Sequence, residues 1–269
     1  MATQTAPIGV FDSGMGGLTV LKALREALPN EDFIYLGDTA RLPYGTKAPS
    51  TVVNYALQAA RTLVSREVKA IVVACNTASG LALPELSKAF DPLPVYGVVL
   101  PGAVAAIQSS QAQSRQNGGV LVLATESTVA GGAYQRALLD ISPGLSVRAH
   151  ACPLWVTLAE MGEQSNRLTD EILCHELRGD LPSTVLLGCT HFPVFNAKLK
   201  DLFPTVRFVD SADTTAEWVA KDLAEQGLLQ SKARSGQSEF LATDGVARFI
   251  RVGSYFLHAD IEHVELVDL

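Results

Sequence analysis

Two of the four cysteines in this chain occupy the same local setting. Cys75 follows the apolar residues 71–74, Cys189 follows the apolar residues 184–188, and polar residues that could start a helix come after each. Such β-branched apolar runs are typical of buried strands, and α/β proteins bind ligands at the carboxyl ends of these strands. Two thiols placed in this way could face one small molecule from opposite sides. That arrangement suits removal of a proton from one face of a carbon and its return to the other face.

The two cysteines belong to a longer correspondence within the chain. Cys189 lies 114 residues after Cys75, and Cys152 lies 114 residues after Asp38, with each of these residues close behind a predicted strand. Ser13 precedes Cys75 by 62 positions, and Thr125 precedes Cys189 by 64. Near-constant spacing over three strand ends predicts two copies of one α/β unit.

Strands and helices are predicted to alternate along the whole chain. The predicted strands are 8–11, 33–36, 70–74, 94–98, 119–124, 146–150, 184–187 and 206–209. Helical patterns include 18–28, 52–64, 129–139 and 212–225. The polar tract 108–119 is expected to be a helix end with a surface turn, and 230–238 a surface loop. This alternation is typical of parallel sheets covered by helices.

We therefore predict an α/β protein with two pseudo-symmetric domains, each a mostly parallel sheet flanked by helices. The first domain is expected to comprise residues 1–99 plus 211–269, and the second residues 100–210. Asp12 and Cys75 fall in the first domain, and Cys189 and His191 in the second. The active site is expected in the cleft between the domains.

The composition favours a cytoplasmic enzyme. The net charge of −7 argues against nucleic acid or an anionic membrane as the main partner. The amino-terminal residues lack the basic and apolar regions of a signal peptide, and the apolar residues 95–107 are too few to span a bilayer. Four scattered cysteines without a paired framework are typical of a reducing compartment.

Several common kinds of site are not supported by the motifs. The segment 14–19 resembles a dinucleotide-binding loop, but Thr19 stands where its last glycine is required, and no phosphate-binding Lys-Ser/Thr pair follows. The chain contains no Cys-x-x-Cys, and the adjacent residues Cys174 and His175 would point in different directions on a helix. We expect no metal ion and no cofactor.

The four cysteines and their neighbours differ in their expected roles. Cys174, in the amphipathic residues 172–177, is predicted to be a small buried hydrophobe, and Cys152 is also predicted to be structural. Asp12 could cap the following helix or act directly at the site. His191, two residues after Cys189, is a natural proton partner.

These motifs resemble the bacterial glutamate racemases, a branch of the cofactor-independent aspartate/glutamate racemase superfamily. The strongest matches, in family order, are residues 12–17, 37–38 with 43–47, 74–78, and 188–193. Weaker matches are 131–138, 151–154 with Glu160, and 209–212. The segment Pro43-Tyr44-Gly45 favours the glutamate branch over the aspartate relatives. The chain departs from the family pattern at Glu126, Ser127, Trp155 and Thr157.

The resemblance implies racemisation by two bases. Cys75 would take the α-proton of D-glutamate and Cys189 that of L-glutamate, with Asp12 assisting Cys75, His191 assisting Cys189, and Glu160 a further partner. The implied substrate-binding residues are Asp12, Ser13, Pro43, Tyr44, Gly45, Asn76, Thr77, Thr125, Thr128, Thr190 and His191. Closure of the two domains over glutamate would exclude water. The resemblance also implies a homodimer that supplies D-glutamate for peptidoglycan synthesis.

Other functions remain possible from the residues alone. A relative acting on aspartate or a hydantoin would keep both cysteines and differ only in its substrate. A decarboxylase with one cysteine is disfavoured because both thiols are present. A non-catalytic amino-acid-binding protein fits the fold but leaves the paired cysteines unexplained.

Overall fold

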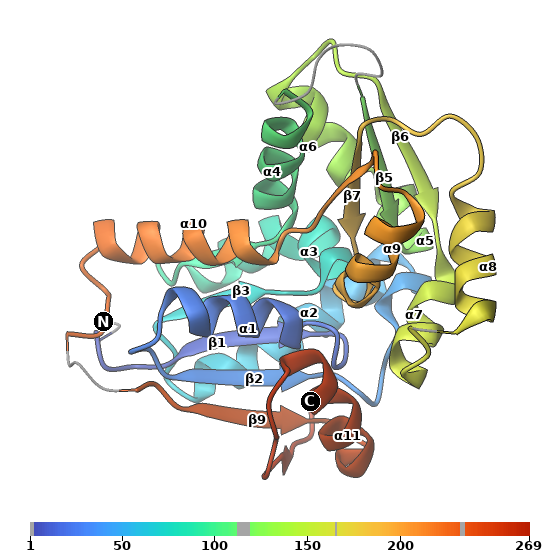
Figure 1. Ribbon diagram of the computed structural model, residues 1–269. Helices are drawn as coiled ribbons and strands as arrows, with labels where there is room; N and C mark the ends of the chain where they lie inside the picture. The colour runs from blue at the N-terminus through green and yellow to red at the C-terminus, as the bar shows by residue number, and fades with distance from the viewer. Residues whose placement is uncertain (1–2, 112–118, 165, 232–234) are drawn as a thin grey trace.

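Two parallel β-sheets form the framework of the protein (Figure 1). The computed structural model describes residues 3–111, 119–164, 166–231 and 235–269. Over these residues, one sheet has the strand order β10-β9-β2-β1-β3-β4 and the other has the order β6-β5-β7-β8. Every pairing between described strands is parallel. The predicted α/β class with two parallel sheets flanked by helices is confirmed.

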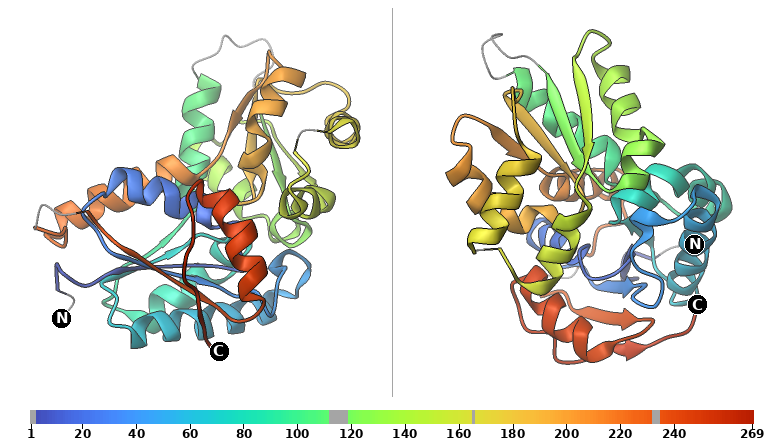
Figure 2. Two further views of the ribbon diagram at one scale, coloured as in Figure 1. Left: turned by 60° about the horizontal axis from the view of Figure 1, so that its bottom comes forward. Right: turned by 90° about the vertical axis from the view of Figure 1, so that its right-hand side faces the viewer.

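The first sheet is covered by helices on both faces. Because side chains alternate along a strand, Val10 and Val72 pack with α1, α10 and α11, whereas Phe11 and Val73 pack with α2 and α3. Figure 2 shows α11 beside α1 on one face. The strands are β1 (Ile8–Asp12), β2 (Phe33–Gly37), β3 (Ala70–Val73), β4 (Val95–Gly97), β9 (Ser238–Ala242) and β10 (Glu265–Leu266). The helices are α1 (Leu18–Ala27), the 3₁₀ helix η1 (Tyr44–Thr46), α2 (Pro49–Ser65), α3 (Asn76–Phe90), α10 (Ala212–Glu225) and α11 (Val246–Leu257).

The second sheet is covered in the same way. Leu123 and Leu187 pack with α7, α8 and α9, and Val122 and Leu186 pack with α4 and α6. The strands are β5 (Val120–Ala124), β6 (Val147–Ala151), β7 (Thr184–Gly188) and β8 (Arg207–Val209). The helices are α4 (Val99–Gln111), α5 (Glu126–Gly131), α6 (Ala133–Ile141), α7 (Pro153–Met161), α8 (Arg167–Glu176), the 3₁₀ helix η3 (Phe192–Phe195) and α9 (Asn196–Leu202).

All eight strands predicted from the sequence are present, and their bounds agree within one residue. The helix predicted over 129–139 is wrong as a continuous element. Gly132 adopts a left-handed conformation, with φ at +65°, which ends α5 and separates it from α6. Most of the predicted turn in 108–119 and the centre of the predicted loop in 230–238 lie outside the described residues.

The two sheets repeat one strand order. The series β2-β1-β3-β4 in the first sheet corresponds to β6-β5-β7-β8 in the second. After β8 the chain returns to the first sheet, where α10 packs on α1 and β9 pairs with β2. The domain bounds, 1–99 plus 211–269 and 100–210, stay a prediction about which residues fold as a unit. No helix in the described part of the chain is both long enough and apolar enough to cross a membrane.

Candidate active site

The carboxyl-terminal edges of the two sheets meet. The Thr19 hydroxyl at the start of α1 donates a hydrogen bond to the Thr190 carbonyl after β7, at 3.2 Å. The Thr77 hydroxyl at the start of α3 lies 3.0 Å from the Thr125 hydroxyl after β5. Gly16 approaches so closely that a Cβ atom there would lie 2.5 Å from Oγ1 of Thr190. The strand ends that carry Cys75 and Cys189 therefore face one another.

Cys75 lies directly before α3 and caps this helix. Its Sγ accepts a hydrogen bond from the Ala78 backbone N–H at 3.4 Å, and it lies 3.7 Å from the Ser13 hydroxyl. Burial, followed by the negative charge of Asp12, raises the pKa of Cys75 to about 12, although the contacts with Ala78 and Ser13 oppose this rise. Cys75 is therefore a thiol, not a thiolate, in this structure at neutral pH.

Cys189 begins a chain of polar contacts that crosses between the two sheets. Its Sγ lies 3.7 Å from Nδ1 of His191, whose Nε2 lies 3.0 Å from a Glu160 oxygen. The other Glu160 oxygen accepts a hydrogen bond from Arg248 at 2.6 Å. His191 also packs edge-on against Phe256 of α11. Arg248 and Phe256 both belong to α11, beyond the segments that resemble the racemase motifs.

These contacts keep His191 positively charged. Burial alone would lower the pKa of His191, but the contacts with Cys189 and Glu160 raise it to about 10. Burial would raise the pKa of Glu160, but His191 and Arg248 hold it below its usual value. The thiol of Cys189 thus has an imidazolium beside it, and the imidazolium is held by a carboxylate.

Asp12 is fully buried at the end of β1. One carboxylate oxygen accepts a hydrogen bond from the Gly14 backbone N–H at 2.9 Å, and the other has no hydrogen-bond partner among the described residues. Burial raises the pKa of Asp12, and the positive charge of His191 opposes that rise. Asp12 does not cap α1, which begins after Gly17. Its free oxygen is therefore available to a ligand or to the Cys75 thiol.

Hydroxyl and amide groups of the predicted site also come together. The hydroxyls of Thr77, Thr125 and Thr128 form a triangle with sides of 2.9 to 3.0 Å. The Asn76 side-chain NH₂ donates to the Tyr134 hydroxyl at 2.6 Å, and its oxygen has no partner in the described part of the chain. Three hydroxyls and one free amide oxygen beside Cys75 provide polar groups for a small charged ligand.

Pro43, Tyr44 and Gly45 lie at the edge of the site. A Cβ atom on Gly45 would lie 2.5 Å from Cβ of Thr125, so this segment touches the second sheet closely. The Tyr44 hydroxyl donates a hydrogen bond to the Asp38 carboxylate and is buried. A cavity of about 220 Å³ opens here, lined by Pro43, Gly45, Thr46, Thr125, Glu126, Pro153, Val156 and Thr157. It includes Glu126 and Thr157, two positions where the chain departs from the family pattern.

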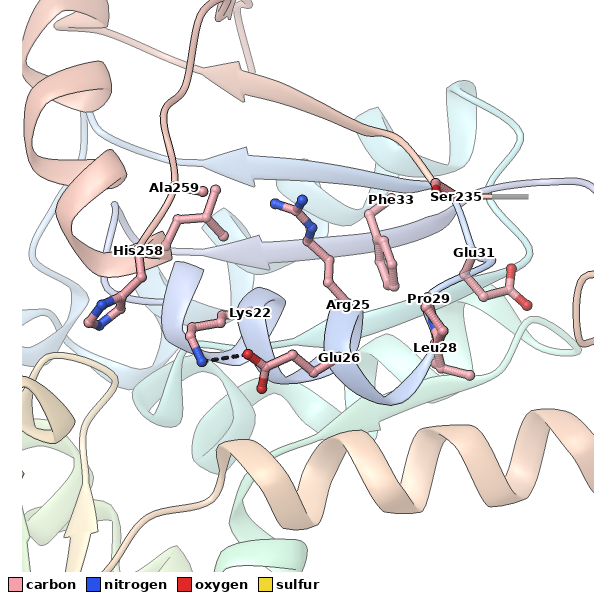
Figure 3. A pocket seen from close by; sticks show the side chains of 12 residues that line it. Lys22, Arg25, Glu26, Leu28, Pro29, Glu31, Phe33, Ser235, His258 and Ala259 are labelled. Carbon is pink, nitrogen blue, oxygen red and sulfur yellow. Dashed lines mark hydrogen bonds and ion pairs between the residues drawn. The ribbon is translucent and has the colours of Figure 1, made fainter. Parts of the chain in front are cut away.

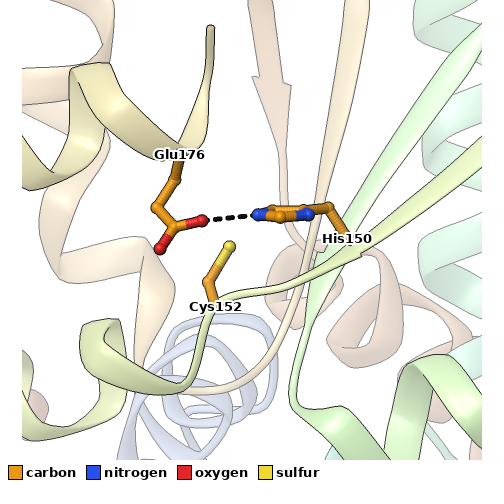
Figure 4. A group of neighbouring side chains, drawn as sticks. All are labelled: His150, Cys152 and Glu176. Atoms are coloured by element: carbon orange, nitrogen blue, oxygen red, sulfur yellow. Dashed lines mark hydrogen bonds and ion pairs between the residues drawn. The ribbon is translucent and has the colours of Figure 1, made fainter.

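Two expectations about cysteines need correction. Cys174 is exposed, not buried, because it lies one position beyond Leu173, which carries the buried face of α8. Cys189 does not start an α-helix, because a turn and the 3₁₀ helix η3 follow it and α9 begins only at Asn196. Cys152 is buried as expected, and its Sγ points toward His150 and Glu176 (Figure 4).

A second cavity of about 360 Å³ lies between α1 and the segment after α11 (Figure 3). Its charged or ionisable lining residues are Lys22, Arg25, Glu26, Glu31 and His258, and Lys22 pairs with Glu26 at 2.6 Å. None of the predicted site residues lines it. The predicted site residues and this larger cavity therefore lie in different places.

Two parallel sheets flanked by helices bring two buried thiols, Cys75 and Cys189, to their facing edges. The Asp/Glu/Hydantoin racemase family matches residues 8–219, and the chain belongs to this family. The glutamate racemase of Geobacter metallireducens is 44% identical over 266 residues, which cover 97% of this chain and 96% of the relative. The resemblance to glutamate racemases is thus confirmed over nearly the whole chain.

Solved structures agree with this assignment. The glutamate racemase of Thermus thermophilus, in complex with β-chloro-D-alanine, has a TM-score of 0.87 at 41% identity and covers 99% of this chain and 98% of its own. The glutamate racemase of Francisella tularensis, in complex with D-glutamate, has a TM-score of 0.90 at 33% identity and covers 98% of each chain.

Proposed function

We propose that this protein interconverts L- and D-glutamate by proton transfer at Cα, with two cysteines as the acid and base and without a cofactor. The observation that carries the proposal is the placement of Cys75 and Cys189 at facing strand ends, each with its own polar partners. The names of the relatives support glutamate as the substrate.

The charges and burial around Cys75 favour a starting state in which this thiol is protonated. With the pKa of Cys75 raised to about 12, this thiol holds its proton and is suited to act as the acid. Cys189, whose sulfur lies beside the His191 imidazolium, acts as the base toward L-glutamate. The Cys189 sulfur takes the α-proton, and the Cys75 thiol gives its proton to the opposite face of the carbanion. The reverse path starts from D-glutamate with the two roles exchanged.

The remaining site residues bind and orient the substrate in this proposal. Backbone N–H groups at the start of α3 and the hydroxyls of Thr77 and Thr190 suit the α-carboxylate, because helix amino termini attract anions. Asp12, with one oxygen free among the described residues, assists proton transfer at Cys75 and binds the substrate ammonium. Ser13, Pro43, Tyr44, Gly45, Asn76, Thr125 and Thr128 complete the proposed pocket.

The physiological setting is part of the same proposal. D-glutamate from this reaction would enter peptidoglycan synthesis, the enzyme would act in the cytoplasm, and two copies would form a homodimer. These statements rest on the resemblance to bacterial glutamate racemases.

Isotope exchange tests the reaction. We expect protein dialysed against a chelator to convert L-glutamate in deuterium oxide into D-glutamate that carries deuterium at Cα. At early times the remaining L-glutamate should keep its protium, because the base that removes the proton is not the acid that returns one. Mass spectrometry of the separated enantiomers measures both. A need for pyridoxal phosphate or a metal, or turnover of aspartate but not glutamate, would contradict the proposal.

The pH dependence tests the role of Glu160. In Glu160→Gln, the pKa of His191 should fall, because one of the groups that raise it loses its charge. The His191 imidazolium then loses its proton at a lower pH. The alkaline limb of the plot of kcat/KM against pH should therefore move to lower pH by roughly one unit or more. The matched control is Glu171→Gln, which removes an exposed carboxylate from the surface of α8. An unchanged profile in Glu160→Gln would mean that Glu160 only supports the fold.

A further inference from the structure

Three potential metal ligands lie together outside the proposed active site. His150 lies near the end of β6, and Cys152 directly follows this strand and precedes α7. The two side chains point toward one another in Figure 4. Glu176 is the last residue of α8, which lies beside them. No sequence motif marks this group, because Glu176 lies 24 positions after Cys152.

The three side chains converge on one point. Nε2 of His150 lies 2.5 Å from a Glu176 oxygen, and one ligand atom from each of the three residues lies within 4.8 Å of the others. The Cys152 side chain is fully buried, and its sulfur forms no hydrogen bond within the described part of the chain. In Figure 4 this sulfur points at the His150–Glu176 pair. The imidazole of His150 is 46% exposed, which leaves a path from solvent.

We propose that His150, Cys152 and Glu176 form a binding site for Zn²⁺, with water as the fourth ligand. Imidazole, thiolate and carboxylate are the three ligand types that Zn²⁺ takes in proteins, at bond lengths of about 2.0–2.3 Å. A tetrahedron with these bonds has ligand atoms roughly 3.3–3.8 Å apart, so small side-chain rotations close the present group around an ion. As the S–Zn bond forms, the thiol proton passes to solvent. Arg148, on the same face of β6 as His150, donates to the Asp180 carbonyl at 2.6 Å instead of entering the group.

The proposed ion would fix the start of α7. Cys152 directly precedes this helix, which carries Glu160 near its end. Trp155, also on α7, packs against Phe192 with ring centroids 5.0 Å apart, just after His191. Zn²⁺ would therefore tie α7 and α8 to β6 behind the Cys189 side of the proposed active site. The site is separate from the acid–base groups, so binding should stabilise the protein and should not be required for proton transfer.

Cobalt spectroscopy tests the site directly. The experiment uses the full-length Cys75→Ser/Cys189→Ser variant, which removes the two other buried thiols. We expect one equivalent of Co²⁺ to produce a thiolate-to-cobalt charge-transfer band in the near ultraviolet and Zn²⁺ to abolish it. Zn²⁺ should also raise Tm, because it binds only the folded chain tightly. In the same background, His150→Gln, Cys152→Ser and Glu176→Gln should each weaken binding by at least about tenfold, as loss of metal-site partners does.

Matched controls come from α8 itself. Cys174→Ser and His175→Gln change an exposed thiol and the neighbouring imidazole without touching the group, and they should bind Co²⁺ like the parent. If Cys152→Ser does not fold, His150→Gln still tests the site. The His150 ring is partly exposed, so its replacement should have little effect on packing. Failure of the parent to form the band, or persistence of the band and affinity in His150→Gln, would overturn the proposal. So would loss of the band in Cys174→Ser.

Discussion

Cys75→Ala and Cys189→Ala are each expected to lower glutamate racemisation by about a thousandfold or more in both directions. Every turnover in the proposed mechanism uses one thiol as base and the other as acid, and a positioned acid or base typically contributes about 10²–10⁴-fold. Both side chains are small and buried, so alanine should leave the fold intact. Circular dichroism follows racemisation through the loss of ellipticity as one enantiomer is converted into the other, and calorimetry measures glutamate binding, which should persist.

The control for this experiment is Cys174→Ala. Cys174 is exposed on α8, so its replacement should leave both activity and stability near those of the parent. A folded Cys75→Ala variant with normal turnover would rule out the two-thiol mechanism. An equal loss of activity in Cys174→Ala would show that the four cysteines had been assigned wrongly.

Lys69→Met is expected to destabilise the protein by about 3–5 kcal/mol, because it leaves a buried carboxylate without its cation. The Lys69 ammonium is fully buried, lies 2.5 Å from a Glu31 oxygen, and donates to the backbone carbonyls of Gln4 and Leu228 at 2.8 Å. The second Glu31 oxygen accepts from the Gln230 backbone N–H. This ion pair therefore joins the segments just before β2 and β3 to two distant segments, one at Gln4 and the other at residues 228–230. Urea unfolding of the parent and the variant measures the change.

Two further variants test whether the loss of stability comes from leaving a buried charge without a partner. Lys22→Met breaks an exposed pair with Glu26 and should change stability by no more than about 1 kcal/mol. Adding Glu31→Gln to Lys69→Met should recover part of the loss, since no charge is then left buried alone. Equal stability of Lys69→Met and Lys22→Met would mean that water reaches Glu31 and solvates it.

The strands were predictable because their signal is local. Most of the predicted strands are short apolar runs, and β1, β3, β5 and β7 are buried along their whole lengths, so a few adjacent residues determine each of these four. The strand ends then placed Cys75 and Cys189 correctly in the fold. The Cys174 prediction failed because an amphipathic helix turns by about 100° per residue, so the position after the buried Leu173 already faces solvent.

The contacts that define the site's charges were not predictable. Arg248 and Glu160 are 88 positions apart, and His191 and Glu160 are 31 apart. Such pairs depend on how α7, α11 and the β7 end pack together, and no local pattern records this. The Tyr44 motif suggested a ligand contact, but the hydroxyl is bound to Asp38, which also holds Arg41. The motif thus identified the segment but not the partner of its side chain.

The repeated strand order of the two sheets has a consequence for metabolism. An enzyme that places a thiol on each side of its substrate must also bind the mirror image of that substrate. The product therefore competes with the substrate for the same pocket. The two enantiomers have equal free energies in water, and no catalyst can change their ratio at equilibrium. Net production of one enantiomer therefore depends on a later reaction that consumes it. The direction of flux would be set by that demand and not by anything built into this protein.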